Sequence, residues 1–181
     1  MITTAPLVEE PRPIYRVSAG ETRLFHILSD RVTGVNTHWF GRSYLCIGAP
    51  DCPACFAGVE QRWTGYLPVA DHRGNRGLLE ISASGGELWE RRLSQGKLFD
   101  SVAKIERPSR FACVRVAELR PAAKPVGTPI EPEEAYRWLM RILGMPARRP
   151  NEQFPEWVGR VRVAAQAALQ RCVGDRNLAS E

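Results

Sequence analysis

Residues 38–55 read HWFGRSYLCIGAPDCPAC, and the prediction of the fold starts from this stretch. Three of the five cysteines in the chain, Cys46, Cys52 and Cys55, lie within ten residues. The CPAC turn at the end of the stretch directs two sulfurs toward one point and places backbone N–H groups where they stabilise thiolates. Cys46 offers a third sulfur across a turn of glycine, proline and aspartate, and His38 offers a nitrogen from the strand before it.

Three cysteines and one histidine make a closed tetrahedral ligand set for structural zinc, with no open position for a reacting water. The sequence therefore predicts one structural Zn²⁺ per chain, held by His38, Cys46, Cys52 and Cys55. Two other interpretations of the cysteines are a disulfide within the CPAC turn and reduced thiols buried as small apolar side chains. His72 and His26 are the alternatives to His38 as the nitrogen ligand.

The composition is that of a globular protein with one main domain. Of the 181 residues, 44% are hydrophobic and 25% are charged, which is enough for a real core. No window approaches the ~18 uninterrupted apolar residues of a membrane span, and the N-terminus lacks the basic and apolar regions of a signal peptide. An odd number of cysteines with a metal-like cluster and no export signal predicts a cytoplasmic protein without a membrane partner.

The formal net charge of +5 is too small to identify a nucleic-acid-binding protein by itself. Residues 1–61 carry five basic and six acidic side chains, whereas residues 62–115 carry ten basic and six acidic ones. Nearly all the basic residues are arginine, which binds phosphate through paired hydrogen bonds and stacks on flat rings. A GC-rich genome that favours arginine codons is an equally good explanation of this excess.

Strand signals dominate the first two thirds of the chain. Residues 22–28 and 32–40 are rich in strand formers and are joined by a hairpin turn at 29–31. Residues 62–69 alternate, so that Trp63, Leu67 and Val69 share a core face and Arg62, Thr64 and Tyr66 share the other face. A basic turn at 71–77 and further strands at 78–81, 98–107 and 111–119 follow.

A short helix is predicted between these later strands, because Ser84 and Glu87 form a capping-box pattern that starts a helix ending near Leu93. The order is then two strands, a metal loop, two strands, a helix and two strands. Short strands with one small helix ahead of the last two are typical of an OB-like small barrel. The predicted fold class is β-rich α+β, an OB-like barrel with an inserted zinc loop, followed by a C-terminal pair of helices.

The predicted domain organisation has four parts. Residues 1–20 form a proline-containing arm, residues 21–119 the barrel with its zinc loop at 38–55, residues 120–131 a proline-rich linker and residues 132–181 a helical extension. The apolar stripes of the two predicted helices, 132–143 and 156–172, pack on each other or on the barrel, or else form a docking surface for a partner. The linker predicts that the extension is separable from the barrel.

The leading functional hypothesis is binding of single-stranded nucleic acid, which requires a positive groove and exposed rings for base stacking. Trp63 and Trp89 are expected in the core instead, and any other ring could join them there. The candidate contact residues are Trp39, Arg42, Tyr44, Arg62, Tyr66, Arg73, Arg76, Lys104, Arg107 and Arg110.

The set His38, Cys46, Cys52 and Cys55, followed by a basic and aromatic strand, resembles the zinc-containing single-stranded DNA-binding proteins of large tailed bacteriophages. The resemblance covers about residues 20–120 and implies an OB-fold, structural zinc and sequence-tolerant binding of single-stranded DNA in replication, recombination or repair. RNA remains an alternative ligand. The chain departs from this family in its short ligand spacings, its N-terminus without a strongly basic arm and its C-terminus without an acidic tail.

The sequence is also compatible with a protein-binding adaptor and gives little support to an enzyme. A zinc-stabilised adaptor would bind a protein partner through the C-terminal helices, and its affinity would depend on salt much less than that of a nucleic-acid-binding protein. An enzyme is not expected and no catalytic residue is proposed, because the chain lacks Walker and Rossmann glycine patterns and a recognisable Ser–His–Asp arrangement. A zinc deaminase would need a His-x-Glu segment before the CPAC turn, and none is present.

Overall fold

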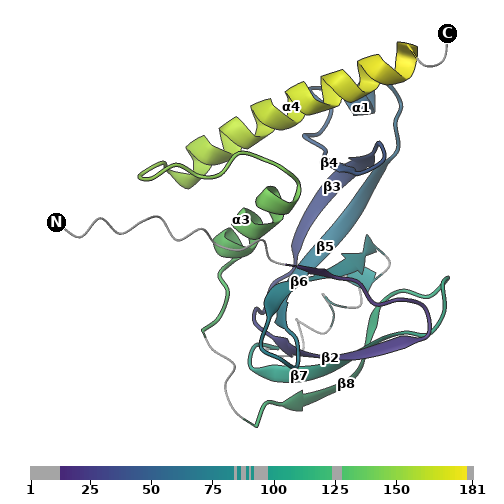
Figure 1. Cartoon of the computed structure of the whole chain (residues 1–181), viewed down its shortest axis with the longest axis vertical. Coiled ribbons are helices and arrows are strands. Elements are labelled where there is room, and N and C mark those ends of the chain that lie inside the picture. The colour runs from purple at the N-terminus through teal and green to yellow at the C-terminus, as the bar shows by residue number, and fades with distance from the viewer. Residues whose placement is uncertain are drawn as a thin grey trace.

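The elements follow one another along the chain in an order dominated by strands (Figure 1). The computed structural model describes residues 13–83, 85, 86, 89, 91, 98–123 and 128–178. The elements are β1 (Ile14–Tyr15), β2 (Glu21–Ile27), β3 (Thr33–Trp39), β4 (Ser43–Leu45), α1 (Pro53–Phe56), β5 (Gln61–Ala70), β6 (Arg76–Ser82), β7 (Ser101–Arg107), β8 (Arg115–Pro121), α3 (Pro132–Ile142) and α4 (Phe154–Leu178).

The strands form one mixed sheet whose main path runs β1-β6-β5-β2-β7-β8. The β1–β6 pair is parallel, and the other pairs are antiparallel. Strands β3 and β4 lie off this path, because β3 pairs with β5 on one side and with β4 on the other. Within the described residues no pairing joins β6 to β8, so the sheet is not closed by hydrogen bonds.

The β-rich class and the C-terminal helices are confirmed, and each predicted strand is present with ends shifted by a few residues. The prediction of an unstructured arm is wrong for its last part. Ile14 and Tyr15 pair with β6, and the Pro13 carbonyl accepts a hydrogen bond from the Leu78 N–H at 3.0 Å. Of the predicted 84–93 helix, positions 85, 86, 89 and 91 are helical, while Ser84, Glu87 and Leu93 lie outside the described residues.

One face of the sheet encloses an apolar core. The alternation of β2, β5, β6 and β7 directs every second side chain into it, and Trp89 from the helical segment fills its end with 1% of its surface exposed. The residues of this first core are Val17, Phe25, Ile27, Leu67, Val69, Leu79, Ile81, Trp89, Leu98, Ala103, Ile105 and Val114.

A second core lies between the opposite face of the sheet and the C-terminal helices. Trp138 and Leu139 of α3 and Trp157 of α4 are buried here together with Tyr66 of β5. The Ile130 N–H donates to the Leu28 carbonyl at 2.7 Å, which attaches the end of the predicted linker to the sheet. The C-terminal helices and the strands therefore share this second core.

The long strand β5 joins the main path of the sheet to a projecting ribbon, which we define as β3, β4, the turn between them and residues 61–63 of β5 (Figure 1). Trp63 fixes the junction. A Cβ placed on Gly34, Gly65 or Gly86 would lie 2.6, 2.6 or 2.8 Å from the Trp63 indole, so the ring fills the space that three missing side chains leave. No helix in the described part of the chain is both long and apolar enough to cross a membrane.

Candidate metal centre

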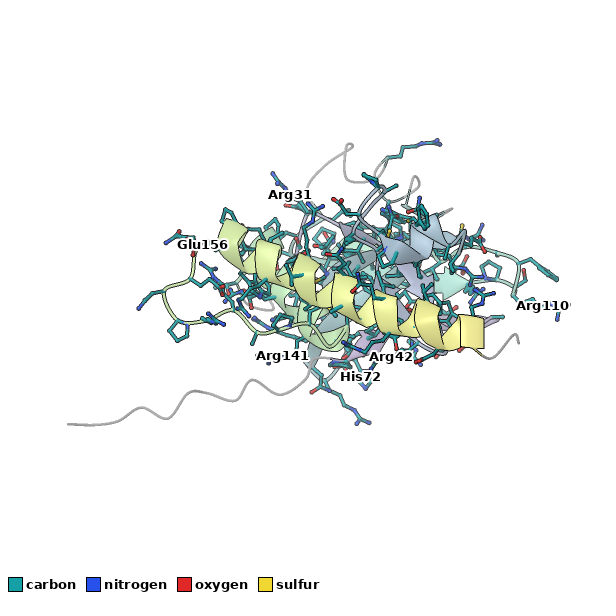
Figure 2. All side chains as sticks on the ribbon, turned by 90° about the horizontal axis from the view of Figure 1, so that it is seen from above. Arg31, Arg42, His72, Arg110, Arg141 and Glu156 are labelled. Carbon is teal, nitrogen blue, oxygen red and sulfur yellow. The ribbon has the colours of Figure 1, made fainter. Side chains whose placement is uncertain are left out.

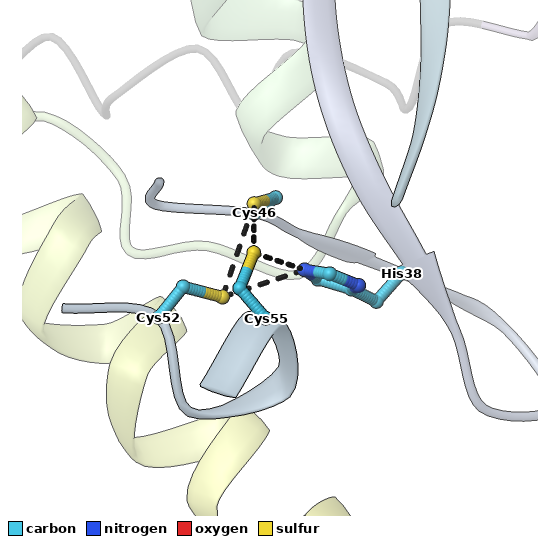
Figure 3. Close-up of side chains that lie close together, drawn as sticks. All are labelled: His38, Cys46, Cys52 and Cys55. Carbon is cyan, nitrogen blue, oxygen red and sulfur yellow. Dashed lines mark hydrogen bonds between the residues drawn. The ribbon is translucent and has the colours of Figure 1, made fainter. Parts of the chain in front are cut away.

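The four predicted zinc ligands come together beside α1 (Figure 3). His38 belongs to β3, Cys46 directly follows β4, and Cys52 and Cys55 lie at the two ends of the first turn of α1. Their ligand atoms all lie within 4.8 Å of one another. The short turn between β3 and β4 and the Cys-Pro-Ala-Cys turn thus bring residues from three elements to one point.

The distances match a tetrahedral zinc site. The Cys46 Sγ lies 3.8 Å from the Cys52 Sγ and 3.5 Å from the Cys55 Sγ, and the His38 Nε2 lies 3.4 and 3.5 Å from the sulfurs of Cys52 and Cys55. With Zn–S bonds of about 2.3 Å and Zn–N bonds of about 2.0 Å, a regular tetrahedron separates two sulfurs by about 3.8 Å and a sulfur and a nitrogen by about 3.5 Å.

The prediction of one structural zinc on these residues is therefore confirmed, with His38 as the nitrogen ligand. His72 lies in the exposed β5–β6 turn, and neither it nor His26 belongs to the cluster. All five cysteines are free thiols, so the disulfide interpretation is wrong.

The backbone orients the ligands. The His38 Nδ1 lies 3.1 Å from the Glu60 carbonyl oxygen, which accepts a hydrogen bond from the Nδ1–H and leaves Nε2 free for the metal. The Gly48 N–H donates to the Cys46 Sγ at 3.4 Å. Such partners fix the tautomer of the imidazole and stabilise thiolate charge.

The pKa values of the thiols show why this cluster needs a cation. Burial raises the pKa of Cys52, but hydrogen bonds from the backbone N–H groups of Cys55 and Ile47 outweigh it and lower the pKa to about 7. Burial, followed by the neighbouring sulfurs of Cys46 and Cys52, raises the pKa of Cys55 to about 12. One thiolate is thus favoured by the protein alone, whereas three adjacent thiolates require a bound metal ion.

The site is closed on the side of α4. Cys52, Ala54 and the α4 residue Leu169 are completely buried in one small apolar cluster, and His38 is also completely buried. Arg162 of α4 reaches the loop before α1, where its guanidinium lies 3.9 Å from the Asp51 carboxylate. His38 and Cys52 are buried and Cys46 and Cys55 are partly exposed. A site with four protein ligands and no open position is suited to structure rather than to catalysis.

Four of the candidate nucleic-acid contacts lie on the ribbon. Trp39 is 61% exposed, and the side chain of Arg62 is 67% exposed. Thr37 pairs with Arg62, and Trp39 lies two positions further along β3, so Trp39 and Arg62 share a face as diagonal neighbours. The Arg42 guanidinium lies 4.8 Å from the centre of the Tyr44 ring, which packs edge-on against Phe40.

The prediction that Tyr66 offers an exposed ring is wrong. Alternation does place Tyr66 on the face opposite Leu67, but α3 and α4 cover that face, and Tyr66 is only 3% exposed. Arg62 is exposed because it lies on the first part of β5, residues 61–63, which pairs with β3 and not with β6 and contributes no residue to the helix-covered core. The aromatic neighbour of Arg62 is therefore Trp39 across the ribbon and not Tyr66 along the strand.

The remaining candidates are spread over other parts of the surface. Arg73 and Arg76 lie at the β5–β6 turn, and Lys104 is exposed on the outer face of β7. The side chain of Arg107 donates to the carbonyls of Ala112 and Arg110 at 3.1 and 2.8 Å, so it holds the β7–β8 turn together. Seen from above, Arg110 lies at one end of the molecule and Glu156 at the other (Figure 2).

One exposed ring in this turn was not predicted from the sequence. Phe111 is 86% exposed, and the guanidinium of Arg110 lies 4.5 Å from the centre of its ring. Its position beside arginines in a turn was the available signal, but the residue was assigned to the start of a strand. Phe111 and Arg110 together form a second exposed pair of a ring and a cation.

Comparison with known proteins gives no match: no protein-family model, curated protein or solved structure matches this chain.

Proposed function

We propose that this protein binds single-stranded DNA with little preference for base sequence, in replication, recombination or repair. The observation that carries the proposal is the exposed Trp39 beside Arg62 on a ribbon held by a metal site. Zinc has a structural role, because it links both strands of the β3–β4 hairpin to α1 through His38 and Cys46. The ribbon can then present its ring and its charges in one fixed arrangement.

The chemistry of this face fits unpaired bases. A base can stack on the Trp39 indole, while Arg62 and Arg42 neutralise phosphates on either side. A stacked base contributes about 1–3 kcal/mol, which outweighs the effect of a net charge as small as that of this chain. Stacking requires a free base face, so the ligand must be single-stranded.

The strand order supports an OB-like barrel as the scaffold. The path β6-β5-β2-β7-β8, with a helical segment between β6 and β7, corresponds to a five-stranded OB barrel that is open between its third and fifth strands. In such barrels, oligonucleotides contact the second and third strands and two loops. Here α3 covers that strand face, which leaves the ribbon and the β7–β8 turn as the accessible contact regions.

The Arg110–Phe111 pair is the second proposed contact. It lies on the turn between the last two strands, and Arg107 holds that turn through two hydrogen bonds. A ligand that reached both places would have a stacking site on the ribbon and another on the turn. The other basic candidates, Arg73, Arg76 and Lys104, would add only to the general electrostatic attraction.

The adaptor hypothesis has less support than the binding of nucleic acid. It relied on the apolar stripes of the C-terminal helices, and the residues of these stripes, including Trp138, Trp157 and Val161, are buried against the sheet within the same chain. The described helices therefore use their main apolar face internally.

The proposal is tested by titrating the zinc-loaded protein with a fluorescent single-stranded oligonucleotide at several salt concentrations. Single-stranded DNA of mixed sequences should bind with similar affinity and more tightly than duplex, and the affinity should fall steeply with salt. A parallel titration with RNA of the same sequence decides between the two nucleic acids. Absence of binding at low salt, or a preference for duplex, would overturn the proposal.

A further inference from the structure

We propose that the outer edge of β8 pairs with β8 of a second copy of the chain and forms an antiparallel dimer centred on Leu119. The proposal is independent of the nucleic-acid-binding function. Strand β8 lies at the bottom of the molecule, far from the ribbon and α4 at the top (Figure 1). It depends on three features of β8: an open edge, the direction of its backbone groups and the order of its charges.

The first feature is the open edge. Strand β8 ends the path of the sheet, and among the described residues it pairs with β7 alone. The segment that contains Gly85 lies against the residue before β8: a Cβ placed on Gly85 would be 3.2 Å from the Val114 carbonyl oxygen. The start of β8 is therefore covered. Residues 117–121 are all exposed, and Leu119 keeps 38% of its surface exposed although it lies opposite the buried Ala103.

The second feature is the direction of the backbone groups. The Ala122 N–H donates to the Asp100 carbonyl at 3.0 Å. In an antiparallel pair these bonds recur at every second residue, so Arg120 and Glu118 direct their N–H and C=O groups toward β7. Those of Leu119 point outward, where they can bond a further strand. A register shift between Lys104 and Ile105 leaves Ala117 as an unpaired bulge residue, so the regular alternation of β8 ends there.

The third feature is the order of the charges. Outward-facing residues must pair with outward-facing residues, so the two-fold axis of a β8–β8 pair passes through a single residue. An axis at Glu118 or at Arg120 would bring two like charges face to face. An axis at Leu119 instead places Glu118 opposite the partner subunit's Arg120, and Arg120 opposite the partner subunit's Glu118.

Centring on Leu119 also explains other properties of the edge. The two Leu119 side chains would meet across the axis and cover apolar surface that is exposed in one copy. Pro121 has no N–H and ends the ladder after a few residues, which limits the pairing. In a two-fold pair, the outer edge of β8 in each copy is bonded to the outer edge of β8 in the other copy. The assembly therefore closes as a dimer and does not grow into a fibre through β8.

Charge exchange provides the test. The variants Glu118→Arg and Arg120→Glu each place like charges opposite one another in the homodimer. When the two variants are mixed, every facing pair is again of opposite charge. The double variant, which exchanges both charges within one chain, also restores complementary pairs. The matched control is Arg110→Glu, a charge reversal on the β7–β8 turn outside the proposed ladder.

Analytical ultracentrifugation over a concentration series measures the association of each sample. We expect the wild type, the control and the double variant to dimerise with similar constants. Each single variant should dimerise at least roughly tenfold more weakly, and the mixture of the two should recover the loss. Zinc content and circular dichroism confirm that each variant is folded. A wild type that is monomeric throughout, or a mixture that associates no better than its components, would overturn the proposal.

Discussion

The thiol of Cys52 is completely buried and lies 3.4 Å from the His38 Nε2. Replacing Cys52 by serine removes a zinc ligand, so the variant should lose stoichiometric zinc and at least about 3 kcal/mol of the free energy of unfolding. Cys172→Ser is the control, because Cys172 lies outside the cluster and its replacement should cost less than about 1 kcal/mol. Elemental analysis and denaturant unfolding measure both quantities; equal stabilities would contradict a structural role for the metal.

Variants of Trp39 and Arg62 distinguish the contributions of base stacking and of phosphate contacts to the proposed affinity for single-stranded DNA. Trp39→Ala should weaken binding of single-stranded DNA by about 1–3 kcal/mol and leave its salt dependence unchanged, because a stacked ring displaces no counterions. Arg62→Ala should reduce the slope of log affinity against log salt by about 0.7 if it contacts one phosphate.

The controls for these variants are Leu24→Ala and Arg16→Ala. Leu24 is an exposed apolar residue on β2, and Arg16 is an exposed arginine paired with Glu80. Neither residue lies on the ribbon. Leu24→Ala should therefore leave the affinity for single-stranded DNA unchanged, and Arg16→Ala should lower it only by the effect of one lost positive charge. If Leu24→Ala weakened binding as much as Trp39→Ala, the ribbon would not be the contact surface.

Tyr66 gives a direct measure of burial under α3. Burial raises the pKa of its hydroxyl from 10.0 to about 12. The folded state favours the neutral phenol, so its contribution to stability is complete below pH 10 and is lost as the pH rises toward 12. An ultraviolet titration should show a tyrosine ionisation at about pH 12 that is absent from Tyr66→Phe. A Tyr66 that ionised at its ordinary pKa would show that the helices do not cover the strand.

At the level of elements, β5 shows that a sequence pattern predicts on which face of a strand a side chain lies, but not what covers that face. Its alternation correctly placed Leu67 and Val69 in the core and Tyr66 on the opposite face. It could not show what covers the opposite face, because Trp138 and Leu139 come much later in the chain and periodicity describes only local differences between faces. The exposure of Phe111 was missed for a related reason, since a single residue in a turn has no period.

The metal site was predictable in full because its information is local and chemical. Three thiols and an imidazole within a short segment have few uses other than zinc, and the tight turns leave little freedom in how they meet. The covering role of α4 was not predictable in this way. Leu169 packs on the CPAC turn through a contact between distant parts of the chain.

That contact predicts a mutational effect on α4. Leu169→Ala removes a completely buried side chain from the cluster beside Cys52 and should cost about 2–5 kcal/mol. Val163→Ala on the same helix is the control, because Val163 is 67% exposed and its loss should cost less than about 0.5 kcal/mol. Thermal unfolding of the two zinc-loaded variants measures the difference; similar midpoints would show that α4 does not support the metal site.

For the whole molecule, the core between the sheet and helices α3 and α4 determines which part of the chain can be deleted without unfolding the rest. Deleting the chain from residue 122 onward would expose Leu28, Val35, Tyr66 and Leu78, which now pack on α3 and α4. The fragment 1–121 should therefore aggregate or unfold without a cooperative transition, whereas the full chain should unfold in one step. Circular dichroism during heating distinguishes the two. A fragment with a sharp transition of its own would restore the separable barrel suggested by the proline-rich linker.

The packing of Trp63 has a consequence for how this chain can diverge. Its indole occupies the space left by Gly34, Gly65 and Gly86, so a side chain on any of the three would displace the ring. Loss of the ring would in turn leave a cavity lined by the backbone of the three glycines. The tryptophan and the three glycines can therefore be inherited only as a set. In distant homologues this set, beside one histidine and three cysteines, would identify the same architecture even after every exposed arginine has been exchanged.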